Sequence, residues 1–187
     1  MTPDEKRVLS IAQRMSSWLP QKLYYSVGRA HQRKWILKRG EIYFVDLGQN
    51  IGSEENKCRP VIVLQADAYN FKSPVFTCAI VSSSAMTIPD IQTQIVGSYP
   101  YIDSQGNNRT LCGVIDLGQI KTLAKERICS NRICMLSKAE MDDVDTKLLN
   151  ALGLKSMLES RDNTIKSLNG KIAHLQLEVL TNNADMV

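Results

Sequence analysis

An arginine and a run of serines stand where two predicted strands begin and end. Arg59 precedes Pro60 and a continuous apolar run, and Ser82, Ser83 and Ser84 follow the next apolar run along the chain. The residue before a proline is held extended, so Arg59 aims a planar, permanently charged fork in one direction. Such a fork stabilises a phosphodiester that passes through a dianionic transition state, and a serine hydroxyl can hold a phosphate oxygen or pass a proton. These residues indicate phosphate chemistry at the mouths of the two strands.

A polar loop leads to this arginine. It runs from residue 50 to residue 60 and contains Gly52, Ser53, Glu54 and Lys57. Loops carried by a rigid scaffold are common places for function. Each feature also has an ordinary explanation, because an arginine at a strand mouth often forms a surface salt bridge, a serine run often forms a turn, and Glu54 could be a solvated carboxylate. The residues by themselves leave both readings open.

Other catalytic arrangements are difficult to build from the middle of the chain. The two histidines, His31 and His174, lie outside residues 39–153, which excludes a Ser-His-Asp arrangement or a histidine acid–base pair within that segment. No acidic cluster there resembles a two-metal nuclease site. The five cysteines are odd in number and form no CxxC pair, so we expect reduced thiols, no metal site and no cofactor.

Residues 39–153 carry the patterns of a small β-rich domain. Alternating or continuous apolar runs predict strands at 41–47, 60–65, 75–81, 91–96 and 111–120. The stretch 101–109 is typical of a loop or hairpin tip. Short strands joined by turns indicate a small barrel. A capping box of Ser137 and Glu140, followed by an apolar stripe, predicts a helix that closes this domain.

The first 38 residues form a separate, helical zone. Thr2, Pro3 and Glu5 are a helix start signal. The apolar spacing predicts a helix that Pro20 ends or kinks, followed by a second helical stretch over 21–37. Residues 1–39 hold nine Lys/Arg and two Asp/Glu, net +7, whereas the other 148 hold fourteen and seventeen, net −3. This basic arm could attract a polyanion or an acidic partner, or could be a solvated amphipathic helix.

The last zone, residues 154–187, carries a heptad pattern. Apolar residues keep 4-3 spacing, interrupted by Arg161, at Leu154, Leu158, Ile165, Leu168, Ile172, Leu175 and Val179. This pattern predicts a coiled-coil helix, whose stripe could pair with another chain or pack on the barrel or on the N-terminal helices.

The chain has no apolar run of the roughly 20 residues that a bilayer requires and no signal-peptide core, so we expect a cytoplasmic protein without a membrane partner.

Several motifs occur together between residues 38 and 153. They are KRGEIYFVDLG at 38–48, then Gly52-Ser53-Glu54, then Arg59-Pro60 before VIVLQ, Ser73-Pro74 before the next strand, and VIDLGQIKT at 114–122. Together they resemble the MazF/PemK family of toxin ribonucleases. The resemblance implies a mainly β fold with helical appendages (α+β), namely a small SH3-like barrel of the CcdB/PemK type with a closing helix. It also implies a homodimer.

The same resemblance implies a function. It points to the toxin of a type II toxin–antitoxin system, with an antitoxin protein as partner, that cleaves single-stranded messenger RNA without a metal. The family's catalytic roles carry over to Arg59 and Ser82. The substrate 2′-hydroxyl would attack its own phosphate and leave a 2′,3′-cyclic phosphate and a 5′-hydroxyl. Candidate substrate contacts are Gly52, Ser53, Glu54, Lys57, Ser83 and Gln119.

Two departures from the family pattern bear on this function. Ser82 stands where the family usually has threonine, so the hydroxyl is kept but the methyl group that fixes its rotamer is missing. Both helical arms lie outside the family core and could cover or extend the groove where an antitoxin peptide docks.

Two other functions stay open. One is a non-catalytic toxin of the same fold that binds a protein such as a topoisomerase. The other is a nucleic-acid-binding regulator that grips phosphate with its basic arm.

Overall fold

A six-stranded sheet forms the centre of the protein. The computed structural model describes residues 1–27, 35–103 and 105–184, and of residues 178–184 it describes the backbone alone. The strand order is β4-β7-β3-β2-β1-β8, and all neighbours are antiparallel. The strands are β1 (Glu41–Asp46), β2 (Cys58–Val63), β3 (Val75–Ser82), β4 (Gln92–Gln94), β7 (Val114–Ala124) and β8 (Cys134–Met135). Together with the family fold described below, this confirms the predicted mainly β architecture.

Alternate residues of the central strands pack into two separate cores. One core contains Ile42 of β1 and Ile62 of β2, and the other contains Val45 and Val61 of the same strands. Successive side chains of a strand point to opposite faces, so strands that are buried on both faces need a continuous apolar run. That requirement explains the run after Pro60 that the sequence shows.

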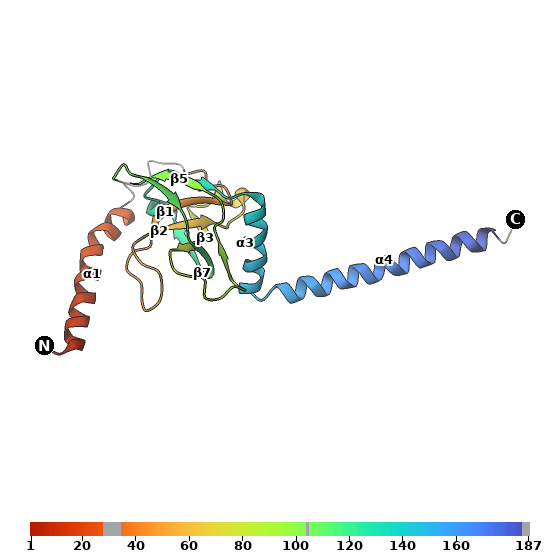
Figure 1. The fold of residues 1–187 in the computed structure, drawn as a ribbon, viewed down its shortest axis with the longest axis horizontal. Coiled ribbons are helices and arrows are strands. Elements are labelled where there is room, and N and C mark those ends of the chain that lie inside the picture. Colours follow the sequence, from red (N-terminus) through yellow and green to blue (C-terminus); the bar gives the residue numbers. More distant parts are fainter. Residues whose placement is uncertain (28–34, 104, 185–187) are drawn as a thin grey trace.

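The closing helix α3 (Lys138–Ala151) covers the first of these cores (Figure 1). Its Val144 is fully buried there. The predicted capping box is present, because the Ser137 side chain accepts from the Glu140 amide and the Glu140 side chain accepts from the Ser137 amide. Two short helical turns, α2 (Asp67–Asn70) and η2 (Lys125–Arg127), lie between strands.

The predicted strand at 111–120 is divided in the structure. Residues 108–111 belong to β6 (Asn108–Leu111), which pairs with β5 (Tyr99–Ile102) in a separate hairpin, and β7 starts only at Val114. The break falls at Gly113, which has a φ of +142°. A Cβ added there would lie 2.5 Å from the Ser82 carbonyl oxygen, so the position has no space for a side chain. The loop predicted at 101–109 is therefore shorter than expected, since its ends are strand residues. The short β8 was not predicted.

Helix α1 (Pro3–Ser26) continues through Pro20, so of the two predicted effects of this proline, an end or a kink, the end does not occur. A proline removes one helical hydrogen bond, but no residue of α1 is buried, and water can bind the freed carbonyl. The second predicted stretch, 21–37, belongs to α1 at its start and is not helical at residues 35–37. Its residues 28–34 lie outside the described part of the chain.

Helix α1 is attached to the barrel at the end of β1. Trp18 Nε1 and the Tyr25 hydroxyl both donate to Asp46 Oδ2, at 3.2 and 3.1 Å. The Arg127 guanidinium lies 5.4 Å from the centre of the Trp18 ring, a cation–π contact. Gly48 lets the indole approach, because an added Cβ there would lie 2.5 Å from the ring.

The C-terminal helix α4 (Lys155–Ala184) leaves the body after α3 and extends away from it (Figure 1). It is the helix that the heptad pattern predicts. Within the described residues, no helix combines the length and the apolar character needed to cross a bilayer.

Candidate active site

The loop between β1 and β2 is held by its own hydrogen bonds. At its base the Leu47 amide donates to the Lys57 carbonyl at 2.8 Å, and the Lys57 amide donates to the Gly48 carbonyl at 2.9 Å. Lys57 closes the loop with a left-handed φ of 64°. Inside the loop, Asn50 Nδ2 donates to the Glu55 carbonyl at 2.7 Å. These bonds fix the loop residues just before Arg59.

A carboxylate from this loop joins the two predicted catalytic residues. Arg59 Nε donates to Glu55 Oε2 at 2.9 Å, and the Ser82 hydroxyl donates to Glu55 Oε1 at 3.1 Å. Arg59 lies on β2 and Ser82 ends β3, which are neighbours in the sheet. The guanidinium and the hydroxyl therefore lie on the same side of the sheet, within reach of one small ligand.

The Arg59 side chain keeps hydrogen-bonding capacity for such a ligand. It is 41% exposed, whereas that of Glu55 is 19% exposed. The bond to Glu55 uses Nε, and within the described residues no hydrogen bond occupies the two terminal amino groups. A guanidinium can bind two phosphate oxygens through such a pair of donors.

Hydrogen bonds restrain the Ser82 hydroxyl in place of the missing methyl group. Besides donating to Glu55, its oxygen accepts from the Ser84 amide at 3.2 Å, and the Ser84 hydroxyl lies 3.0 Å away. A threonine would fix its rotamer by crowding, but here polar contacts on two sides do so.

A bulge in β7 brings Gln119 to the same cluster. The register between β3 and β7 shifts between Ala79 and Ile80, and residues 117–119 of β7 have no partner on β3. Bulges commonly re-aim side chains next to functional sites. The Gln119 side-chain oxygen accepts from the Glu55 amide at 3.1 Å, so Gln119 contacts the backbone of the residue that joins Arg59 and Ser82.

The part of the chain that forms the sheet and α3 matches a known protein family. Residues 38–152 match the family described as PemK-like, MazF-like toxin of type II toxin–antitoxin system. The chain belongs to this family. The likeness covers the sheet, the loop and α3, and leaves α1 and α4 outside.

Named relatives of this MazF-like chain are ribonucleases. The chain is 35% identical over 119 residues to "Endoribonuclease EndoA" of Bacillus subtilis, and the match covers 64% of this chain and 97% of that protein. It is 31% identical over 121 residues to "Endoribonuclease MazF" of Staphylococcus epidermidis, covering 65% and 95%. A solved "Endoribonuclease in complex with its cognate antitoxin" from a mycobacterial species has the same fold, with a TM-score of 0.50 and 24% identity over 63% of this chain and 96% of that one.

The other predicted substrate contacts of this MazF-like chain surround the cluster less closely. Glu54 forms an ion pair with Lys121 at 2.9 Å and is 55% exposed. Gly52 has a left-handed φ of +62° with open space around it. Ser53, Lys57 and Ser83 are exposed, and among the described residues no side-chain hydrogen bond joins them to Arg59 or Ser82.

Sequence reasoning missed Glu55, the residue that connects the site. The available signal was its position four residues before Arg59 in the same polar loop. That signal is weak, because Glu54 lies beside Glu55 in the same loop. Only the folded loop shows which of the two carboxylates contacts Arg59. Glu55 contacts Arg59, whereas Glu54 contacts Lys121.

Two thiols lie behind the active site. Cys58 and Arg59 are consecutive on β2, so their side chains point to opposite faces. Cys58 Sγ lies 3.5 Å from Cys129 Sγ. The hydrogen bond with Cys129 lowers the pKa of the Cys58 thiol, although burial and Asp46 oppose it. Both thiols line a cavity of about 680 Å³ beside Phe44 and Tyr101. Among the described residues, these thiols included, no group of three or more His, Cys, Asp or Glu side chains is arranged to hold a metal ion.

Proposed function

We propose that this MazF-like toxin is an endoribonuclease that cleaves single-stranded messenger RNA at the Arg59–Ser82 site without a metal. The observation that carries the proposal is the carboxylate of Glu55, which holds the guanidinium and the hydroxyl together at 2.9 and 3.1 Å. Family membership and the two ribonuclease relatives support it.

The proposed reaction uses the nucleophile that RNA itself carries. The 2′-hydroxyl gives its proton to solvent as its oxygen forms a bond to the adjacent phosphorus. The bond from phosphorus to the 5′-oxygen breaks, and that oxygen takes up a proton from solvent. The products are a 2′,3′-cyclic phosphate and a 5′-hydroxyl. Arg59 stabilises the charge that develops on the phosphate oxygens through its terminal amino groups. Ser82 donates to a non-bridging oxygen.

Glu55 acts in this proposal as a positioning residue. Before substrate binds, its carboxylate holds the Arg59 side chain through Nε, which leaves the fork that faces solvent free for phosphate. It also accepts the hydrogen bond of the Ser82 hydroxyl. When RNA binds, this hydroxyl donates to the phosphate instead. Misplacement of a group in such a site can lower the rate by about a hundredfold, which is ~2.7 kcal/mol of barrier.

The remaining predicted residues have supporting roles. Gln119 supports the Glu55 backbone, and Gly52, Ser53, Glu54, Lys57 and Ser83 contact the RNA around the scissile phosphate. Residues 39–153 form the nuclease domain, with residues 1–38 and 154–187 as extensions. The partner in the cell is an antitoxin, as in the mycobacterial complex, and the site of action is the cytoplasm, where messenger RNA is found.

The activity is tested with a single-stranded RNA in the presence of EDTA. The wild-type chain cleaves it, and Arg59→Ala lowers kcat/KM by about a hundredfold or more, as loss of a charge-stabilising group does. The matched control is Arg109→Ala, which removes an exposed arginine that pairs with Asp103 in the hairpin. Full activity in Arg59→Ala would remove the site assignment.

The chemistry is tested on the products. A 2′-deoxy substitution at the cleaved nucleotide is expected to abolish cleavage, because the attacking oxygen is then absent. The 5′-hydroxyl that cleavage creates should accept a phosphate from polynucleotide kinase without prior dephosphorylation. Cleavage of the 2′-deoxy substrate would show that water attacks instead. Growth arrest by an Arg59→Ala, Ser82→Ala double variant would favour the protein-binding alternative.

A further inference from the structure

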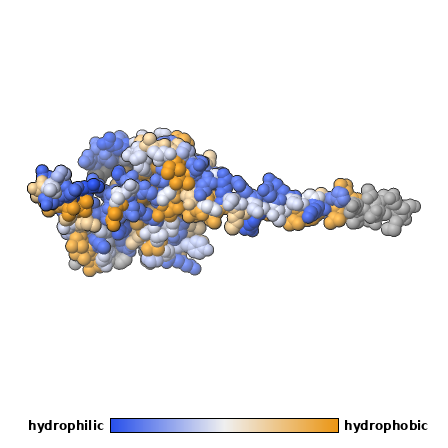
Figure 2. All heavy atoms as spheres, turned by 90° about the horizontal axis from the view of Figure 1, so that it is seen from below, coloured by the Kyte–Doolittle hydropathy of each residue, from blue (hydrophilic) through white to orange (hydrophobic). Residues whose placement is uncertain are grey.

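The apolar stripe of α4 is exposed along a helix that extends away from the body. Ile165, Ile172 and Leu175 are 53%, 53% and 59% exposed. In the space-filling view, apolar atoms recur at intervals along the projecting arm (Figure 2). Isolated helices are marginal in water, and amphipathic helices gain most of their stability by packing. Such a helix requires a partner surface.

The stripe is too narrow for packing flat on a globular body. Of the residues that flank it, Met157 is apolar, and Lys155, Asp162, Thr164, Asn169, Lys171 and Gln176 are polar or charged. A helix that covers a core has a broad apolar face, whereas a stripe confined to two heptad positions is the seam of a coiled coil.

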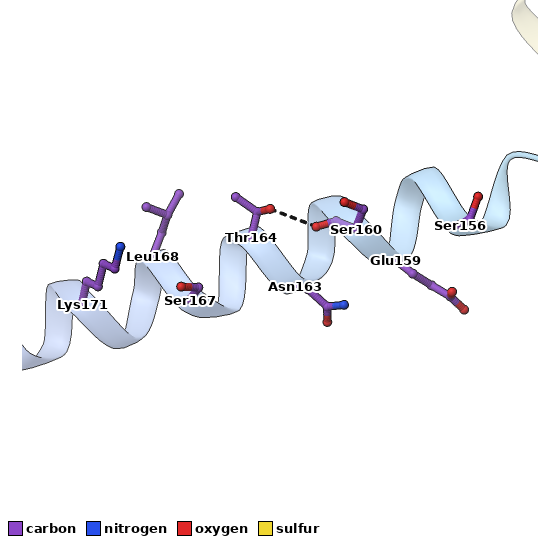
Figure 3. Close-up of a pocket in the computed structure, with 8 residues that line it drawn as sticks. All are labelled: Ser156, Glu159, Ser160, Asn163, Thr164, Ser167, Leu168 and Lys171. Carbon is purple, nitrogen blue, oxygen red and sulfur yellow. Dashed lines mark hydrogen bonds between the residues drawn. The ribbon is translucent and has the colours of Figure 1, made fainter.

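Figure 3 shows how polar this helix is beside the seam. A shallow hollow runs along it, and the labelled residues are Ser156, Glu159, Ser160, Asn163, Thr164, Ser167, Leu168 and Lys171. All come from α4, so the hollow has a single wall and encloses no ligand. Leu168 is the one residue among them that belongs to the stripe. The side of the helix next to the seam is therefore polar.

The residue types along the stripe specify the kind of pairing. With Leu158 at heptad position a, the next a positions are Ile165 and Ile172, and the sequence continues this series with Val179. The d positions hold leucine, at Leu154, Leu168 and Leu175, with Arg161 as the exception. Branched residues at a with leucine at d favour parallel, two-stranded coiled coils.

We infer that α4 pairs in parallel with α4 of a second copy of this chain and so forms a two-stranded coiled coil. In that register a faces a and d faces d, which stacks isoleucine layers between leucine layers. Among the described flanking positions, no like charges oppose each other in the g-to-e′ pairs, which are Met157 with Asp162, Thr164 with Asn169, and Lys171 with Gln176. The inference does not depend on the ribonuclease activity.

Arg161 is the polar residue of this seam, and it lowers the stability of the pair. In the aligned register the two Arg161 side chains share one layer, where the guanidinium groups cannot hydrogen-bond each other because neither carries an acceptor. Asp162 of the second copy, at the edge of the same layer, offers each guanidinium an opposite charge. Arg161→Leu is therefore expected to tighten the dimer by about tenfold or more, since it restores a leucine layer.

The first experiment compares two aspartate substitutions in the full-length chain by analytical ultracentrifugation. Ile172→Asp places a charge in the seam, and Ala173→Asp places the same charge on the outer side one residue later. Both positions are exposed in the single chain. Ile172→Asp should raise the dissociation constant of the assembly at least about a hundredfold, as buried unpaired charges do, while Ala173→Asp changes it by about twofold or less, as surface charges do.

The second experiment tests the orientation by oxidative cross-linking and peptide mapping. Leu175→Cys puts thiols opposite each other only in the parallel register, within the Cα separation of about 4–7 Å that a disulfide needs. Gly170→Cys, at the outer position f, is the control. We expect a 175–175 link between copies and none at 170.

Each outcome decides the inference. A dimer that dissociates to monomers with Ile172→Asp supports it, and so does a tetramer that falls to a dimer, in which the barrels make a second contact. Equal dissociation constants for the two aspartate variants overturn it. Absence of the 175–175 link, or a wild-type chain that stays monomeric until an antitoxin is added, overturns it as well.

Discussion

At the scale of single residues, the candidate active site depends on how one carboxylate is shared. Glu55 accepts from Arg59 with one oxygen and from Ser82 with the other. Its own backbone is held by Asn50 and Gln119 from two different parts of the chain. Glu55 is thus fixed at the backbone and at the side chain, so it orients the two groups that would meet the phosphate.

Loss of this carboxylate is expected to impair turnover more than binding. Glu55→Ala should lower kcat by about tenfold to a hundredfold because Arg59 loses its orientation, with a smaller change in KM. The melting temperature should hardly change, since a partly exposed ion pair contributes about 1 kcal/mol or less. Steady-state kinetics and thermal unfolding check both.

The matched control is Asp142→Ala, which breaks another ion pair of the same i, i+4 spacing, between Lys138 and Asp142 on α3. It should leave kcat unchanged. Glu55→Gln keeps an acceptor oxygen and should retain more activity than Glu55→Ala. Equal kcat values for wild type and Glu55→Ala would disprove the positioning role.

Cys58 is expected to react faster with alkylating agents than the other thiols with shifted pKa values. The thiolate is the nucleophile, and the hydrogen bond with Cys129 lowers the pKa of Cys58. Burial raises the pKa of Cys78 and of Cys134 to about 12, which keeps them protonated. In Cys129→Ala the donor is removed, so the pH midpoint of Cys58 alkylation should move upward. Iodoacetamide labelling followed by mass spectrometry measures this, and an unmoved midpoint would contradict it.

At the scale of elements, Glu140 connects α3 to the chain between β4 and β5. It caps its own helix at Ser137, and it also accepts from the Gly97 amide at 3.0 Å and from the Tyr99 hydroxyl. Burial alone would raise the pKa of Glu140, but these hydrogen bonds outweigh it and hold the pKa at about 2. The ionised side chain is therefore part of the folded structure.

Glu140→Gln is expected to destabilise the protein in a pH-dependent way. At neutral pH it should lower the free energy of unfolding by about 2 kcal/mol, the scale of hydrogen bonds to a charged group. The native pKa of about 2 lies below the unfolded value near 4.5, so the wild-type advantage is complete above pH 4.5 and is lost as the pH falls towards 2. Urea unfolding across this range measures it. A constant difference, or a similar loss in the exposed Asp142→Asn control, would refute the assignment.

Elements whose causes are local could be predicted from the sequence. The capping boxes at Thr2 and Ser137 both formed, because each needs only residues three apart. Whether Pro20 ends the helix could not be decided from the sequence, since its cost depends on whether water reaches the freed carbonyl, and only the exposed setting of α1 shows that. The bulge in β7 is set by pairing with β3 across the sheet, so it has no local signal.

At the scale of the whole molecule, the net positive charge lies in the N-terminal arm, and that arm touches the barrel near the loop between β1 and β2. Trp18 and Tyr25 bind Asp46, which ends β1 immediately before the loop. Residues 1–39 carry net +7 against −3 for the rest. We therefore expect the arm to bind additional phosphates of an RNA that lies at the loop.

Deletion of residues 1–34 is expected to flatten the salt dependence of RNA binding. The segment holds seven Lys/Arg and two Asp/Glu. For single-stranded nucleic acid, the slope of log Kd against log salt falls by about 0.7 for every phosphate that the shortened chain no longer neutralises. Fluorescence anisotropy with Arg59→Ala, which should bind but not cleave, measures the slope without hydrolysis. An unchanged slope would show that the arm is a solvated helix without a role in RNA binding.

The sequence by itself determined the family, the positions of most strands along the chain, the closing helix and the identity of the two candidate catalytic residues. These follow from local patterns, namely alternation, capping and the run that contains Arg59 and Pro60, which are written in neighbouring residues. Only the tertiary structure decided that Arg59 meets Ser82 through Glu55 rather than Glu54, that Gln119 joins them, and that Trp18 anchors α1. Each is a contact between segments far apart in the chain, and its geometry depends on strand register, a bulge and the path of a loop, which no local pattern specifies.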